Sequence, residues 1–177
     1  FEKKMIETAL AEKPDLIVLT GDYVQTMEDT KKRKLASELN KLLKVYRLYA
    51  AFGVYACRGD AEDNNWEACF EGLPVQCFIN SRTIVTERYA ITGLELNDSF
   101  NEHLKINMPD SASHRFNIVF GHAPDYALSG IKADLCIAGH THGGQVRLPF
   151  IGPLITLSKV PREWSRGMNK IDDDTYL

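Results

Sequence analysis

Four short apolar runs, each followed by glycine and a possible metal ligand, constrain this chain more than any other feature. They are DLIVLT (15–20), GVYAC (53–57), FNIVF (116–120) and DLCIA (134–138). Their length and their content of β-branched and aromatic residues favour buried strands, as they do for a fifth run, YAITGLEL (89–96). Apolar residues at helical spacing in 1–12 and in KLASELNKLLKVYRLYAAF (34–52) alternate with the first of these runs. This alternation predicts an α/β fold with a largely parallel sheet layered against helices.

Candidate ligands follow each of the first four runs. Gly-Asp follows the first strand directly and the second after one arginine, Gly-His follows the third, and Gly-His-Thr-His follows the fourth. Sites in α/β sheets form at the carboxyl ends of the strands, where glycine lets the backbone turn sharply. The sequence therefore predicts one site with these ligands: Asp22, Asp60, His122, His140 and His142.

The chemistry of this ligand set narrows the choice of metal. Carboxylate oxygen and imidazole nitrogen suit zinc, manganese, iron or nickel, and five ligands exceed the needs of one tetrahedral zinc. Two divalent ions that share one bridging carboxylate account for the whole set, and such pairs catalyse displacement at phosphorus. A mononuclear iron oxygenase, which uses two histidines and one carboxylate, is an alternative at this point.

Simpler interpretations exist for single residues. Asp22 suits a turn or a helix N-cap, and Asp60 suits the cap of a helix in EDNNWEACF (62–70). His103 and His114 are expected at the surface and are not assigned to the site. Two imidazoles between glycines gain nothing from packing, so the Gly-His-Thr-His motif favours a metal site over these alternatives.

Composition excludes several other classes of protein. The 177 residues carry a net charge of −3, and the short basic run KKRK (31–34) is expected on a solvated helix face, so no nucleic-acid partner is indicated. The four cysteines form no CxxC pair, which argues against a zinc ribbon or a dithiol redox site. The absence of linker composition predicts a single domain over 1–177. We expect it to be partial at both ends, and its compartment stays open, with the cytoplasm or a membrane surface favoured.

The ordered motifs resemble those of the calcineurin-like metallophosphoesterase superfamily. TGDYV, FGHAP and AGHTHGGQVRLP resemble its second, fourth and fifth motifs, and RGDAE stands where the third, Gly-Asn-His/Glu, belongs. The resemblance covers nearly the whole chain, and the extended last motif is similar to that of bacterial membrane-associated phosphoesterases. It implies a layered β-sandwich-type core flanked by helices, with the first strand, its Asp-x-His motif and the C-terminal strands expected outside this sequence.

The resemblance also implies roles for individual residues. Asp22 would bridge two divalent ions, His142 would bind the first ion, and His122 and His140 would bind the second together with Asp60. The implied activity is hydrolysis of a phosphomonoester, phosphodiester or pyrophosphate by a metal-activated hydroxide. Ala61 replaces the histidine that aids departure of the leaving group, so a degenerate member that binds metal or a phosphorylated ligand with little turnover is the alternative.

The segment VRLPFIGPLITLSKVPREW (146–164) combines apolar and basic residues. A loop packed against the domain is the favoured interpretation, and a lipid-facing patch is the alternative. Arg147 is a candidate for binding substrate phosphate. The expected partner is a phosphorylated small molecule or a lipid headgroup, with peripheral membrane contact possible in the second case.

Overall fold

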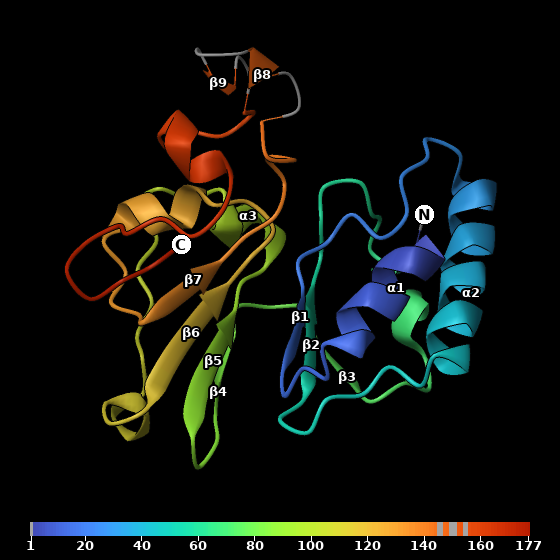
Figure 1. The fold of residues 1–177 in the computed structure, drawn as a ribbon, viewed down its shortest axis with the longest axis horizontal. Coiled ribbons are helices and arrows are strands. Elements are labelled where there is room, and N and C mark those ends of the chain that lie inside the picture. The colour runs from blue at the N-terminus through green and yellow to red at the C-terminus, as the bar shows by residue number, and fades with distance from the viewer. Residues whose placement is uncertain (1, 145–146, 149–151, 154–155) are drawn as a thin grey trace. The chain divides into compact units, whose positions relative to one another are not determined.

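A computed structural model describes residues 2–144, 147–148, 152–153 and 156–177 of the chain (Figure 1). These residues belong to two compact units, 1–77 and 78–177, and each unit is described by itself. The expectation of a single domain over 1–177 stays a prediction.

The first unit contains a three-stranded sheet with helices on one side. In chain order its elements are α1 (Glu2–Ala11), β1 (Ile17–Leu19), α2 (Asp29–Val45), β2 (Val54–Cys57), the 3-10 helix η1 (Trp66–Phe70) and β3 (Val75–Phe78). The strands lie in the order β1-β2-β3, and β1 pairs with β2 in parallel, with Leu19 opposite Ala56. Figure 1 shows α1, α2 and η1 on the same side of this sheet.

Apolar side chains from the helices and from β2 form the core of the first unit. Among the buried members are Ile6, Leu43, Val54, Ala56, Trp66 and Phe70. Burial of one large apolar side chain contributes about 1.5–3 kcal/mol, so this cluster holds the helices against the sheet. Because β1 and β2 are parallel, their carboxyl ends lie at the same edge of the sheet. Asp22 and Asp60 follow the strands at this edge.

The helix α2 ends earlier than the apolar pattern over 34–52 predicts. The N–H of Tyr46 still donates to the carbonyl of Leu42 at 3.1 Å, but Arg47 has a φ of 50° and turns the chain. This turn buries Leu48, which is 4% exposed. The apolar residues after Val45 therefore reach the core as a loop, and the predicted helix was too long.

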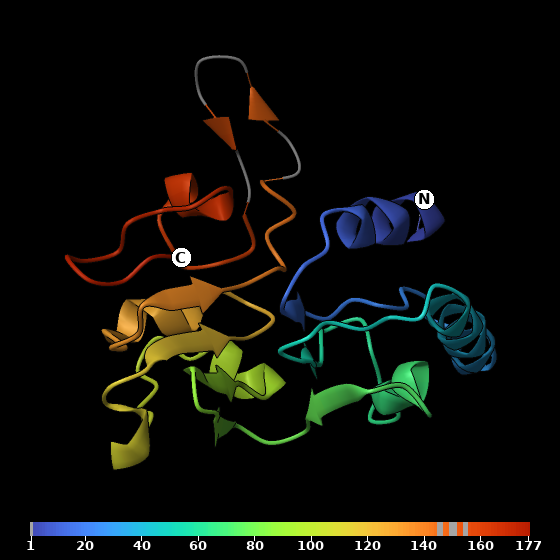
Figure 2. The same ribbon diagram turned by 60° about the horizontal axis from the view of Figure 1, so that its bottom comes forward.

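The second unit contains a four-stranded sheet. Its elements are β4 (Arg82–Val85), β5 (Tyr89–Gly93), α3 (Leu96–Ser99), η2 (Asp110–Ala112), β6 (Phe116–Phe120), η3 (Asp125–Ser129), β7 (Leu135–Ile137), β8 (Arg147–Leu148), β9 (Gly152–Pro153) and η4 (Arg162–Ser165). The order is β4-β5-β6-β7; β5, β6 and β7 are parallel, and β4 is antiparallel to β5. Figure 2 shows β6 in yellow and β7 in orange side by side, with their arrowheads pointing the same way.

The α/β class with helices beside largely parallel strands is confirmed in both units. All five predicted strands are present: four lie within one or two residues of the predicted bounds, and the run 89–96 forms β5, which ends at Gly93. In the described part of the chain, no helix combines the length and the apolar character needed to cross a bilayer.

Candidate metal centre

His122 lies at the carboxyl end of β6 and is almost completely buried, with 1% of its surface exposed. The preceding Gly121 has no room for a larger residue, because an added Cβ would lie 2.8 Å from the Cβ of Ser99. The N–H of Ala123 donates to the Ser99 hydroxyl at 3.2 Å. The turn after β6 is thus fixed against α3, and the imidazole of His122 has a defined position.

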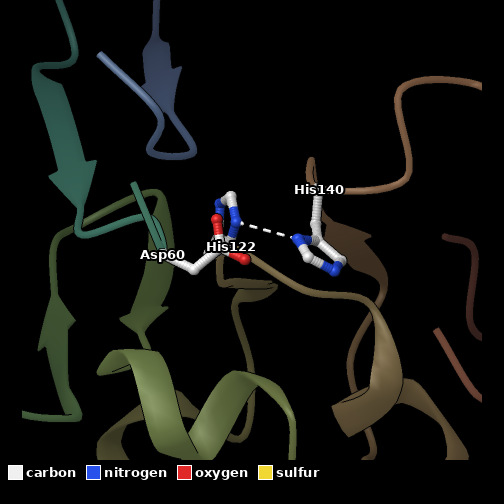
Figure 3. A group of neighbouring side chains, drawn as sticks. All are labelled: Asp60, His122 and His140. Carbon is white, nitrogen blue, oxygen red and sulfur yellow. Dashed lines mark hydrogen bonds between the residues drawn. The ribbon is translucent and has the colours of Figure 1, made fainter. Parts of the chain in front are cut away.

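His140 lies in the turn after the neighbouring strand β7. The N–H of Gly139 donates to the carbonyl of His122 at 2.8 Å, which joins the two turns. His122 Nε2 and His140 Nδ1 are 3.1 Å apart, as the dashed line in Figure 3 marks, and the rings are inclined at 71°. The ring of Phe100 packs edge-on against His140, with centroids 4.9 Å apart. Two imidazoles predicted from separate motifs therefore meet within the second unit.

The distance between these two nitrogens suits both a direct hydrogen bond and two ligands of one metal ion. Without a cation, one nitrogen must carry the proton and donate it to the other. The separation also suits two neighbouring ligands of one cation, since two bonds of about 2.1 Å at a right angle place their nitrogens about 3 Å apart. The donor chemistry and spacing of the pair thus fit a divalent transition metal.

His142 is exposed and follows His140 in a tight turn. The N–H of Thr141 donates to the carbonyl of Gly139 at 2.7 Å, and the Thr141 hydroxyl donates to the carbonyl of Ser165 at 2.9 Å. Both histidines have left-handed backbones, with φ of 61° at His140 and 49° at His142. The structure brings His122 and His140 into contact, while the place of His142 in the metal site stays a prediction.

In the first unit, Asp22 is held in the turn after β1. Its φ is 58°, and one carboxylate oxygen, Oδ1, accepts the N–H of Ala61 at 3.1 Å. Gly59 lies so close that an added Cβ would be 2.3 Å from both the N and the Oδ1 of Asp22. The loops after β1 and β2 are therefore in direct contact, as expected for parallel strands that end at one edge.

Glu62 joins these two loops and was not predicted from the sequence. It is 5% exposed. Its Oε2 accepts the N–H groups of Asp22 and Gly59, both at 2.9 Å, and its Oε1 accepts the N–H of Val24 at 3.0 Å. A glutamate in a polar loop is usually solvated, so spacing and composition alone give no signal for this role.

Asp60 is exposed and does not cap a helix. The next helix, η1, begins at Trp66 with Asn65 as its N-cap, so the capping interpretation of Asp60 is wrong. The cap interpretation of Asp22 is also wrong, because α2 begins at Asp29 with Glu28 as its N-cap. Neither aspartate is accounted for by helix capping.

The remaining residues singled out from the sequence are either at the surface or outside the described part of the chain. His103 and His114 are exposed, and the side chain of His103 lies 3.8 Å from Glu102, as expected for surface histidines. The side chain of Arg147 lies outside the described residues, as do Phe150, Ile151, Leu154 and Ile155 of the suggested lipid-facing segment. Their predicted roles stay predictions.

Buried neutral groups surround the strand ends. Burial raises the pKa of Tyr23 well above its ordinary value, and Cys57 and Glu62 add to this effect. Its single hydroxyl hydrogen is shared between the carbonyls of Leu19 at 2.8 Å and Cys57 at 2.6 Å, which ties β1 to β2. Burial also raises the pKa of Cys57, so its thiol stays protonated and is unsuited to binding metal.

Comparison with known families decides the affiliation of the chain. The family model for the calcineurin-like phosphoesterase domain matches residues 3–144. The chain belongs to this family. The match includes all four Gly-Asp and Gly-His turns, and the predicted superfamily is confirmed.

Curated relatives are bacterial members of the same family. The chain is 29% identical over 168 residues to the uncharacterized metallophosphoesterase YkuE of Bacillus subtilis, with 87% of this chain and 56% of the relative covered. It is 27% identical over 153 residues to the phosphodiesterase YaeI of Escherichia coli, with coverage of 83% and 56%. The chain thus spans little more than half the length of these relatives.

Proposed function

We propose that this chain contributes to a metal-dependent phosphoester hydrolase. The observation that carries the proposal is the pair of imidazole nitrogens of His122 and His140, 3.1 Å apart after adjacent parallel strands. Membership of the calcineurin-like phosphoesterase family and the names of the relatives, metallophosphoesterase and phosphodiesterase, support it.

The proposed ligand set follows the order of the family motifs. His122 and His140 hold one divalent ion, and Asp60 supplies a carboxylate to it, because RGDAE stands where the third family motif belongs. Asp22 bridges to a second ion that His142 also binds. Manganese, zinc, iron and nickel all suit this mixture of imidazole and carboxylate.

When bound, such ions activate water for attack and stabilise charge on the oxygens of a phosphoryl group. The protein residues position these ions. Glu62 accepts the backbone N–H of Asp22, and the N–H of Ala61 donates to Oδ1 of Asp22, so both residues orient this aspartate. Phe100 and His122 limit the orientations that the His140 ring can adopt. We propose a phosphorylated small molecule or a lipid headgroup as the substrate.

The proposal is tested by metal content and turnover of the purified protein after growth with manganese and zinc. Elemental analysis of full-length protein that includes an upstream Asp-x-His motif is expected to find about two ions per chain, and this protein should hydrolyse bis(p-nitrophenyl) phosphate; residues 1–177 alone should bind fewer ions. His142→Ala should abolish hydrolysis and lower the metal content. The control His103→Ala, an exposed histidine outside the site, should change neither quantity. Absence of bound metal, or equal effects of the two substitutions, would contradict the proposal.

A degenerate, non-hydrolytic member is the second candidate, and Ala61 favours it. Its methyl group has no proton to donate, although its N–H holds Asp22. Metal binding without turnover of any aryl or alkyl phosphate, with manganese and zinc both supplied, would select this alternative. The mononuclear oxygenase considered from the sequence would need oxygen, so hydrolysis of a phosphoester under anaerobic conditions would exclude it.

A further inference from the structure

The outer nitrogen of His140 contacts a backbone carbonyl from a distant part of the chain. His140 Nε2 lies 3.1 Å from the carbonyl oxygen of Leu157. A carbonyl oxygen only accepts hydrogen bonds, so Nε2 must carry the proton of a neutral ring. Nδ1, which faces His122, then keeps its lone pair. The Leu157 carbonyl thus selects the tautomer that presents Nδ1 as a ligand atom.

The side chain of Leu157 does not explain the position of this carbonyl. It is 69% exposed, and the residue has a φ of 53°. A left-handed conformation disfavours a residue with a Cβ by about 1–2 kcal/mol. Interactions elsewhere in the segment must therefore hold Leu157 in place.

Asp125 supplies these interactions. It is 2% exposed, and its two carboxylate oxygens accept from the two residues after Leu157. Oδ2 accepts the hydroxyl of Ser158 and Oδ1 accepts the N–H of Lys159, both at 2.8 Å. The Ser158 hydroxyl oxygen also accepts the N–H of Val160 at 3.3 Å.

The position of Asp125 in the chain connects this clamp to the other imidazole. Asp125 begins η3, three residues after His122, and the turn between them is anchored by Ala123 and Ser99. One turn therefore carries both a predicted ligand, His122, and the carboxylate that fixes the carbonyl behind the second ligand, His140. A displacement of Asp125 would disturb both sides of the imidazole pair.

We propose that Asp125 is a positioning residue, which holds the Leu157 carbonyl and thereby the tautomer and ring orientation of His140. The metal-binding part rests on the proposed function, whereas the tautomer can be measured in metal-free protein. Partners behind a ligating histidine commonly change metal affinity 10- to 100-fold.

The test compares Asp125→Asn with Asp134→Asn. Asp134 is a matched control, because its carboxylate also accepts a backbone N–H in the second unit, that of Asn117 at 2.6 Å. The first readout is the ¹⁵N shifts of the His140 ring in metal-free protein at a mildly basic pH, where imidazole is neutral. The second is the dissociation constant for zinc, measured by calorimetry.

Asp125→Asn should reduce the Nε2–H tautomer of His140 and weaken zinc binding about tenfold or more, while Asp134→Asn should change neither. Ser158→Ala removes one of the two bonds and should give a smaller change in the same direction, and it serves as the test variant if Asp125→Asn fails to fold. Unchanged His140 shifts in a folded variant would overturn the inference. A tautomer change in a protein that binds no zinc would support the positioning role and count against the proposed function.

Discussion

Three of the five predicted metal ligands have left-handed backbones: Asp22, His140 and His142, with φ between 49° and 61°. This conformation costs a residue with a Cβ about 1–2 kcal/mol, and such strain is concentrated at functional sites. Hydrogen bonds from neighbouring turns hold the side chains of Asp22 and His140 in position. Stability is therefore given up at the residues whose side chains are predicted to bind metal.

Glycine should be better tolerated than alanine at position 142. Both His142→Gly and His142→Ala remove the imidazole, but only alanine keeps the Cβ that disfavours φ of 49°. In metal-free protein, urea unfolding should find the glycine variant more stable by about 1 kcal/mol. At the exposed His114, which is not among the described residues with positive φ, glycine should be the less stable of the two. If the glycine and alanine variants rank in the same order at positions 142 and 114, the backbone of His142 is not strained.

The side chain at position 61 should decide which leaving groups are accepted. Ala61 cannot protonate a departing oxygen, so nitrophenyl phosphates should be cleaved well and alkyl phosphates poorly. A positioned general acid accelerates reactions roughly a hundredfold to ten-thousandfold. Ala61→His should accordingly accelerate alkyl phosphate hydrolysis far more than nitrophenyl phosphate hydrolysis.

Asp60→Asn, alone and combined with Ala61→His, separates this effect from the added charge of Asp60. If the alkyl-to-aryl rate ratio is unchanged while the metal content is intact, position 61 does not face the leaving group. RGDAE would then be wrongly matched to the third family motif.

At the scale of elements, the loops after β1 and β2 behave as one structure. Glu62 accepts N–H groups from both loops, those of Asp22, Val24 and Gly59. It also contributes, after burial, to the raised pKa of the Cys69 thiol. The Glu62 carboxylate therefore links the two loops through three hydrogen bonds.

Glu62→Gln should destabilise the protein, because an amide group offers one acceptor oxygen where the carboxylate offers two. An unsatisfied buried N–H costs about 1–3 kcal/mol. Thermal unfolding should show a clearly lower melting temperature, and zinc affinity should fall as Asp22 loses its orientation. Glu12→Gln, at an exposed glutamate in the same unit, should leave both values unchanged. Equal melting temperatures for the two variants would show that Glu62 does not hold the loops.

The strand ends could be predicted from the sequence because the same pattern, an apolar run followed by a glycine and a candidate metal ligand, occurs four times. The strands β3 and β4 were missed, since VQCF and RTIV mix polar and apolar residues and are short. The contact between His122 and His140 followed from parallel strands ending together. The roles of Glu62 and Asp125 could not be predicted, because they depend on which backbone N–H groups the folded loops leave to be satisfied.

At the scale of the whole molecule, buried thiols in both units favour the protonated form. Burial is the main cause; it raises the pKa of Cys69 to about 11 and that of Cys136 to about 12. A raised pKa in the folded state gives stability that is complete below the ordinary thiol pKa, near pH 9, and is lost as the pH rises toward these values.

The free energy of unfolding should therefore fall between pH 9 and 11, by up to about 1.4 kcal/mol per pH unit for each thiol. Urea unfolding at several pH values measures this slope. Cys136→Ala should make it shallower. Val119→Ala, at a fully buried residue that does not titrate, should lower stability equally at every pH. An unchanged slope in Cys136→Ala would show that this thiol does not contribute.

The close approach of Gly59 to Asp22 limits how this protein can change in evolution. Any side chain at 59 would place a carbon 2.3 Å from the backbone nitrogen of Asp22, and backbone cannot be exchanged by mutation. A library of variants selected only for folded protein, in a background already inactivated by His142→Ala, should still retain glycine at 59. Glycine at position 59 would then be retained after catalysis is lost. The packing of the two loops, and not the activity, would be what requires it.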